Sequence, residues 1–249
     1  MSFKDLFSER PDAYARYRPS YPAALFAWLA AQAPSAKLAV DVGTGSGQGA
    51  VALAEHFERV LGLDPSEAQL RNARAHPRVE YRVARAEQLA ADDASADAIF
   101  VAQALHWFDH AAFFREVRRV LAPGGVLAVS CYQLTQITPE VDAVVMELYE
   151  THLGPYWEPE RVLVETGYRT IAFPFPELDV PAFAMRMTWT VDDLIGYLGT
   201  WSPLKRFRSD RGFDPLEATI PKLRAAWGGA AERTVVWPFI ARAFRASLS

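Results

Sequence analysis

Cysteine is nearly absent from this chain of 249 residues, because Cys131 is its single example. One cysteine cannot form an intrachain disulfide or a thiolate metal cluster, so we expect the protein in a reducing compartment, the cytoplasm. Histidine and carboxylate side chains with metal-ligand spacing are also missing from the sequence, which predicts no metal site.

The chain has no long apolar run and no excess of positive charge. Its apolar runs are shorter than the roughly 20 residues that span a bilayer, and residues 1–10 do not form the apolar core of a signal peptide. The formal net charge is −4, so neither nucleic acid nor a membrane is an expected partner. Hydrophobic residues make up 51% of the chain, which is enough for a full globular core. No feature of the sequence indicates an oligomeric state.

Short apolar runs alternate with helical patterns from Leu38 to Cys131, which is typical of βαβ units in a mostly parallel sheet. We expect strands at Leu38–Val42, Arg59–Leu63, Val79–Val83, Asp97–Val101, Val126–Cys131, Tyr168–Phe173 and Thr234–Ala241, the last two as an antiparallel edge. The helices expected between the early strands are Gly49–Phe57, Ser66–Ala75 and Ala111–Leu121. The sequence therefore predicts an α/β fold with a Rossmann-like open, mostly parallel seven-stranded sheet, an antiparallel edge strand and a helical cap.

Three segments of one structural domain are expected along the chain. Residues 1–34 are predicted to form N-terminal lid helices, and residues 35–133 a ligand-binding core. Prolines and tryptophans become frequent after Gln133, so we expect residues 134–249 to supply cap helices and the final strands that complete the sheet.

A glycine-rich loop follows the first expected strand, in the sequence Asp41-Val-Gly-Thr-Gly45-Ser-Gly47. Glycines at alternate positions allow a tight turn and let a ligand lie against the backbone. A dinucleotide fingerprint would place a glycine where Gln48 stands, and no Gly-Lys-Ser/Thr follows to make a P-loop. Asp64 ends the second expected strand about twenty residues later, where a carboxylate can accept hydrogen bonds from ribose hydroxyls. The two features together indicate an adenosine-containing cofactor, although each alone is compatible with an ordinary βα turn or a helix N-cap.

With these residues the sequence resembles the class I S-adenosylmethionine-dependent methyltransferases, and within them the trans-aconitate methyltransferase-like (methyltransferase type 11) branch. The matching motifs are Arg18-Pro-Ser-Tyr-Pro22, Asp41-Val-Gly-Thr-Gly45, Gly62-Leu-Asp-Pro-Ser66, Ala86-Glu87, Ala104-Leu-His-Trp-Phe-Asp109 and Arg119-Val-Leu-Ala-Pro-Gly-Gly125. The resemblance implies S-adenosyl-L-methionine as cofactor, bound by Tyr17, Arg18, Asp41, Gly43, Thr44, Gly45, Asp64, Pro65, Ala86, Glu87, Ala102 and Gln103. Two positions depart from the family pattern, because Thr44 replaces a smaller residue or cysteine and Arg85 replaces an aspartate that meets the adenine.

The segment after the fourth expected strand is predicted to face the methyl acceptor, since ligands of open α/β sheets bind beyond the carboxyl ends of the strands. It contains His106, which can hydrogen-bond the acceptor or act as a base, and Trp107. Trp157 and Arg161 are further candidates for acceptor binding, as are Arg169 and Arg186. The alternatives are a hydrogen-bonded structural histidine, core aromatic residues and solvated arginines.

The resemblance implies methyl transfer to a small-molecule acceptor, with a carboxylic acid as the candidate class. A carboxylate needs no deprotonation at neutral pH, so catalysis would consist mainly of positioning, and an alcohol, phenol or amine would require a base such as His106. Two other hypotheses stay open: a non-catalytic protein that binds S-adenosylmethionine or its demethylated product, and an NAD-dependent oxidoreductase.

Overall fold

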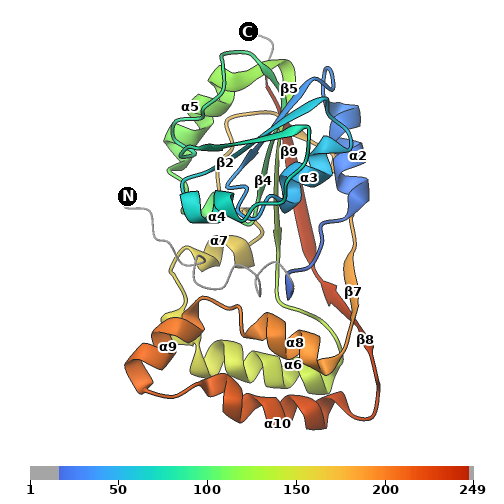
Figure 1. Cartoon of the computed structure of the whole chain (residues 1–249), viewed down its shortest axis with the longest axis vertical. Coiled ribbons are helices and arrows are strands. Elements are labelled where there is room, and N and C mark those ends of the chain that lie inside the picture. The colour runs from blue at the N-terminus through green and yellow to red at the C-terminus, as the bar shows by residue number, and fades with distance from the viewer. Residues whose placement is uncertain (1–16, 247–249) are drawn as a thin grey trace.

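A seven-stranded sheet forms the centre of the protein, and a group of helices lies at one end of it (Figure 1). The computed structural model describes residues 17–246. The strand order is β3-β2-β1-β4-β5-β9-β6. The strands are β1 (Leu38–Val42), β2 (Arg59–Asp64), β3 (Val79–Val83), β4 (Ala96–Ala102), β5 (Leu121–Tyr132), β6 (Glu177–Leu178) and β9 (Phe239–Arg245).

The sheet is mostly parallel, as predicted. Strands β1 to β5 pair in parallel, whereas β9 runs antiparallel to both β5 and β6. The antiparallel strand therefore lies one position inside the edge, which the two residues of β6 occupy. The predicted α/β fold with a seven-stranded, Rossmann-like sheet is confirmed.

Helices cover both faces of the sheet because successive strand residues point to opposite sides. In β1, Ala39 packs with α2 (Ala23–Gln32) and α3 (Gln48–Ala54), while Val40 packs with α5 (His110–Val120) on the other face. The short α4 (Glu67–Arg71) follows β2. Within the segment predicted as a lid, residues 1–34, the apolar side chains of α2 are buried against the sheet. Residues 1–16 of that segment lie outside the described residues.

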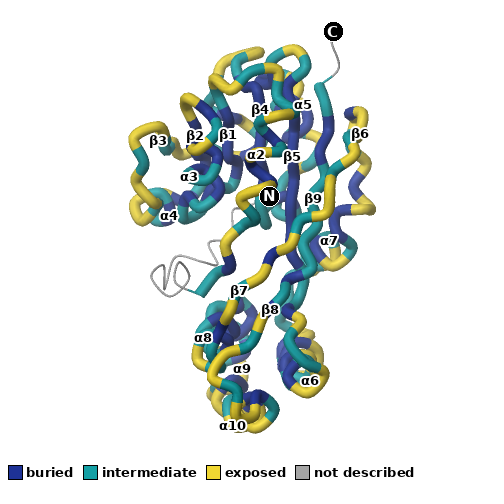
Figure 2. The backbone as a smooth tube through the Cα atoms, turned by 90° about the vertical axis from the view of Figure 1, so that its right-hand side faces the viewer, coloured by how far each residue is buried: buried dark blue, intermediate teal, exposed yellow. Residues whose placement is uncertain are grey.

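The helical cap has a hydrophobic core of its own, below the sheet in Figures 1 and 2. Its elements are α6 (Pro139–Met146), the π-helical turn η2 (Glu147–His152), the 3-10 turn η3 (Gly154–Tyr156), α8 (Val191–Leu198), α9 (Pro203–Arg211), α10 (Pro215–Trp227), and the antiparallel pair β7 (Met185–Trp189) and β8 (Arg233–Trp237). Trp227 and Trp237 are among the largest fully buried side chains, which explains why tryptophan is frequent in this half of the chain. The helices found in residues 17–246 are all too short or too polar to cross a bilayer.

One predicted strand is absent and another is divided in two. Tyr168–Phe173 forms a turn after α7 (Arg161–Glu165), because Gly167 and Tyr168 have φ values of +61° and +59°, which no strand residue adopts. Thr234–Ala241 is divided at Pro238 into β8 and β9, which belong to different sheets. Proline has no backbone N–H to donate to a continuous ladder, so the strand changes sheet at that residue.

Candidate active site

A cavity of about 1110 Å³ opens at the carboxyl ends of β1, β2 and β4. Parallel strands bring the residues that follow each of them to the same edge of the sheet, and the lining of this cavity comes from those segments. The largest contributions are the glycine loop after β1, Asp64–Ser66 after β2, residues 84–88 after β3 and residues 102–110 after β4.

The glycine loop is fixed at its start and open at its centre. The backbone N–H groups of Gly43 and Thr44 donate to the carbonyl oxygen of Leu63, at 2.8 and 3.0 Å. A Cβ atom on Gly43 would stand 2.6 Å from the Cβ of Ala104, so that glycine is required for close packing. Gly45 has a φ of +52°, and a Cβ there would meet no atom within 4 Å. The backbone at Gly45 is therefore bare toward the cavity that it lines.

Asp41 lies at the floor of the cavity and is buried. Its Oδ2 accepts a hydrogen bond of 2.6 Å from the hydroxyl of Thr44. Burial raises the pKa of Asp41 to about 7, and the neighbouring Asp64 carboxylate adds to the rise, while hydrogen bonds from Thr44 and the backbone of Ala50 oppose it. A positively charged ligand group beside Asp41 would favour its charged form and lower that pKa.

Asp64 is held beside the glycine loop by two backbone donors. Its Oδ2 accepts from the N–H of Gly45 and its Oδ1 from the N–H of Ser66, each at 2.9 Å. Two such bonds orient the carboxylate at the end of β2. A carboxylate oxygen has more than one lone pair, so it can accept more than one hydrogen bond.

Charged residues form the part of the cavity that follows β3. Arg85 and Glu87 both line it, with their side-chain nitrogen and oxygen 3.9 Å apart. The other carboxylate oxygen of Glu87 accepts from the backbone N–H of Asp109, the N-cap residue of α5, at 3.0 Å. Glu87 thus connects the loop after β3 to the segment after β4, and both Glu87 and Asp109 line the cavity.

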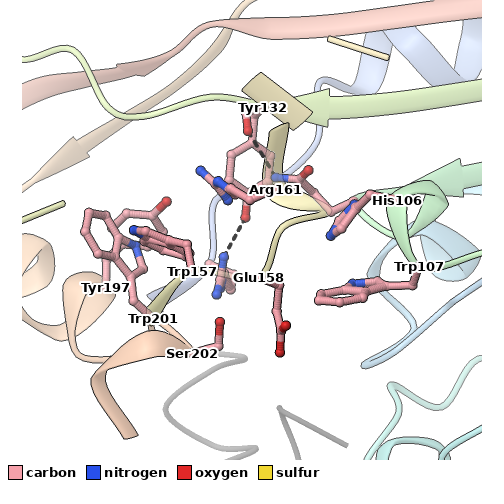
Figure 3. Close-up of a pocket in the computed structure, with 11 residues that line it drawn as sticks. His106, Trp107, Tyr132, Trp157, Glu158, Arg161, Tyr197, Trp201 and Ser202 are labelled. Carbon is pink, nitrogen blue, oxygen red and sulfur yellow. Dashed lines mark hydrogen bonds between the residues drawn. The ribbon is translucent and has the colours of Figure 1, made fainter. Parts of the chain in front are cut away.

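A second, smaller cavity of about 80 Å³ adjoins the first (Figure 3). The two cavities share five lining residues, which are Arg18, Gln103, His106, Trp107 and Tyr132. The remaining lining residues are Trp157, Glu158, Arg161, Tyr197, Trp201 and Ser202. In Figure 3 the rings of His106 and Trp107 lie opposite those of Trp157, Tyr197 and Trp201. The smaller cavity is therefore an aromatic compartment between the sheet and the cap.

Two guanidinium groups reach this compartment. Nη1 of Arg18 donates to the hydroxyl of Tyr132 at 2.9 Å. Nε of Arg161 donates to the hydroxyl of Tyr149 at 3.1 Å, and its Cζ lies 4.8 Å from the ring centroid of Trp157. Arg161 makes no ion pair with any carboxylate of residues 17–246. Its terminal N–H groups can thus bind an anion in the compartment.

His106 is neutral in this site. Burial, together with the smaller effects of the positive charges of Arg161 and His110, lowers the pKa of His106 to about 3. Its Nδ1 lies 3.2 Å from the hydroxyl oxygen of Tyr168, and its ring centroid lies 4.7 Å from that of Trp107. An imidazole with so low a pKa is a hydrogen-bonding group rather than an effective base near neutral pH.

A model of the methyltransferase domain family matches residues 40–129. A protein of Dictyostelium discoideum whose name assigns it to the methyltransferases is 35% identical over 209 residues, 82% of this chain and 80% of that protein. A solved structure from Anaeromyxobacter dehalogenans, titled as a type II methyltransferase, is 51% identical with a TM-score of 0.86, and covers 93% of this chain and 99% of that one.

This chain belongs to the S-adenosylmethionine-dependent methyltransferases. Because the chain belongs to this family, the hypothesis of an NAD-dependent oxidoreductase is rejected. A trans-aconitate 2-methyltransferase of Methylobacterium radiotolerans is 39% identical over 126 residues, 48% of this chain and 47% of that enzyme. Its similarity thus covers about half of each protein.

All but one of the residues expected to bind the methyltransferase cofactor line the same cavity. Those that line the larger cavity are Arg18, Asp41, Gly43, Thr44, Gly45, Asp64, Pro65, Ala86, Glu87, Ala102 and Gln103. Tyr17 lines neither cavity, and its ring packs against Gly196 of α8, so its place at the cofactor stays a prediction. Among the acceptor candidates, Arg161 and Trp157 line the smaller cavity, whereas Arg169 and Arg186 line neither.

Sequence reasoning missed several residues of the methyltransferase site. Tyr132 lies at the carboxyl end of β5, and the rule that identified the segment after β4 applies equally to it. Tyr197 and Trp201 reach the smaller cavity from the cap through long-range packing, for which the sequence gives no local signal.

Proposed function

We propose that this methyltransferase transfers the methyl group of S-adenosylmethionine to a small molecule that carries a carboxylate. The observation that supports it is the Arg161 guanidinium, which lies without a carboxylate partner in residues 17–246 on the wall of the smaller cavity. Arg18, shared by both cavities, adds a second positive charge. Guanidinium groups match the geometry of a carboxylate and remain charged at any physiological pH. The similarity to a trans-aconitate 2-methyltransferase points to the same class of acceptor.

The larger cavity fits the cofactor by size and by the chemistry of its walls. Gly45 leaves the backbone bare where a ligand can lie against it. We assign Asp41 to the amino group of the cofactor, because a buried carboxylate suits a cation. We assign Asp64 to the ribose hydroxyls, because its oriented carboxylate suits a pair of hydrogen-bond donors. The remaining assignments are Gly43, Thr44 and Gly45 to the methionine part, Ala86 and Glu87 to the adenine, and Arg18, Pro65, Ala102 and Gln103 to the surrounding walls.

The proposed methyl transfer to a carboxylate involves no proton transfer by the protein. The cofactor supplies a methyl group on a positively charged sulfur, and a carboxylate oxygen gives the electron pair for the new bond while the old pair stays on sulfur. No proton is released, so no base is required. Arg18 and Arg161 orient the carboxylate, His106 offers it a hydrogen bond, and Trp107 and Trp157 exclude water from the compartment. Catalysis then rests on positioning the two reactants.

Purified protein with S-adenosylmethionine and a panel of small carboxylic acids, including trans-aconitate, tests the acceptor. We expect formation of the demethylated cofactor together with a methyl ester seen by mass spectrometry. Arg161→Met should raise the KM for the acid at least tenfold. Arg186→Met is the matched control, because this arginine is exposed on β7 and lines neither cavity.

Two results would contradict the proposal. Methylation of the amide analogues of these acids as readily as of the acids themselves would remove the role of the carboxylate. Binding of S-adenosylmethionine without transfer to any acid in the panel would favour the non-catalytic binding protein.

A further inference from the structure

Tyr168 is held behind the acceptor compartment in a strained backbone conformation. It is a buried residue with a φ of +59°, a region that bulky side chains rarely adopt. Its N–H donates to the carbonyl of Leu163 at 2.8 Å, and its carbonyl accepts from Nη1 of Arg242 at 2.7 Å. Strain of this kind persists where the surrounding structure enforces it, and it is concentrated at functional sites.

The hydroxyl of Tyr168 points to one nitrogen of His106. The distance from Oη to Nδ1 is 3.2 Å, and within residues 17–246 Nδ1 is the one hydrogen-bond acceptor found for that hydroxyl. Burial raises the pKa of Tyr168 well above its ordinary value, so the phenol keeps its proton. A buried hydroxyl hydrogen without an acceptor is unfavourable, so the O–H donates to Nδ1.

A neutral imidazole carries a single proton, on either Nδ1 or Nε2. If Nδ1 accepts from Tyr168, the proton of His106 is on Nε2. No hydrogen bond of Nε2 is found within the described part of the chain, and the ring lines both cavities. In Figure 3 this ring is turned toward the compartment, next to Trp107.

We infer that Tyr168 is a positioning residue that fixes the Nε2–H tautomer of His106, so that His106 donates a hydrogen bond to the methyl acceptor and does not act as its base. The identity of the ligand rests on the proposed function, whereas the tautomer rests on the protein alone. The arrangement selects an acceptor that presents a lone pair already free of a proton, such as a carboxylate oxygen. An alcohol or an amine, which needs a base, receives none from this histidine.

Nitrogen-15 NMR of the histidine rings tests the tautomer without any ligand. In wild-type protein at pH 7, Nε2 of His106 should appear protonated and Nδ1 unprotonated. Tyr168→Phe keeps the ring and removes the hydroxyl, so the Nδ1 resonance should move while the Nε2–H tautomer loses population. The pKa of His106 should also rise, since the variant loses a bond that favours the neutral ring, although Arg161 and His110 still face it. Tyr197→Phe, on the opposite wall, is the control and should leave both nitrogens unchanged.

Protonated Nδ1 in the wild type, or an Nδ1 resonance unaffected by Tyr168→Phe, would overturn the inference. If the variant fails to fold, the wild-type spectrum alone tests the tautomer.

The role of His106 toward the acceptor is tested with the most active acid of the panel as probe. His106→Gln keeps an N–H donor and should retain most of kcat/KM, whereas His106→Leu should lose at least tenfold. Equal loss in both variants would indicate a base and overturn the donor role. Absence of acid methylation with an intact Nε2–H signal would instead contradict the proposed function.

Discussion

The ring of Tyr17 lies so close to Gly196 of α8 that a Cβ on this glycine would stand 2.6 Å from two ring atoms. The next residue, Arg18, lines both cavities and bonds to Tyr132. The contact therefore connects the cap helix to the position of a guanidinium in the site.

Gly196→Ala should move Tyr17 and, with it, Arg18. Alanine is favoured over glycine inside a helix by up to about 1 kcal/mol, which offsets part of the cost of displacing the ring, so the melting temperature should change by only a few degrees. The affinity for the demethylated cofactor, measured by calorimetry, should nevertheless fall severalfold. Gly154→Ala, where a Cβ meets no atom within 4 Å, is the control in the cap. Unchanged affinity in Gly196→Ala would show that the position of Arg18 does not depend on this contact.

Asp41 should make the protein less stable as the pH rises. Its pKa is 3.8 in the unfolded chain and about 7 in the folded protein. Between these values the folded state binds more protons than the unfolded state, so the free energy of unfolding decreases from about pH 4 to about pH 7. Asp41→Asn should flatten this decrease, as measured by urea denaturation at pH 5 and pH 8. An equally steep decrease in the variant would contradict the raised pKa.

Gly45 and Gly212 offer a matched pair for testing the cavity. Both have a positive φ and open space where a Cβ would be, but only Gly45 lines the larger cavity. An alanine in this backbone conformation costs about 1 to 2 kcal/mol. Both Gly→Ala variants should lose stability by that amount in denaturant titrations, whereas only Gly45→Ala should bind S-adenosylmethionine at least tenfold more weakly. Equal affinities in the two variants would place the cofactor elsewhere.

The sequence predicted best those strands and site residues that are set by local patterns in the chain. The strands from Leu38 to Cys131 are predictable because short apolar runs alternate with helical patterns there. The glycine loop and the acidic residue after the second strand indicated Asp41 and Asp64, and the rule that ligands bind beyond the carboxyl ends of the strands indicated His106. The turn at Gly167 and Tyr168 was mistaken for a strand because apolar residues follow it. The contact of Tyr17 with Gly196 joins segments far apart in the chain, and no local pattern reports such packing. The division into segments 1–34, 35–133 and 134–249 stays a prediction.

Calorimetric titration with S-adenosylmethionine, on the wild type and on Asp64→Ala, tests the proposed cofactor site most directly. The carboxylate of Asp64 is fixed by the N–H groups of Gly45 and Ser66 beside the glycine loop. We expect the wild type to bind the cofactor and Asp64→Ala to bind it at least tenfold more weakly at a temperature where the variant's thermal melt shows it fully folded, since the N–H groups of Gly45 and Ser66 lose their acceptor and the variant is less stable. Equal binding by both proteins, or binding of NAD in place of S-adenosylmethionine, would contradict the site described above.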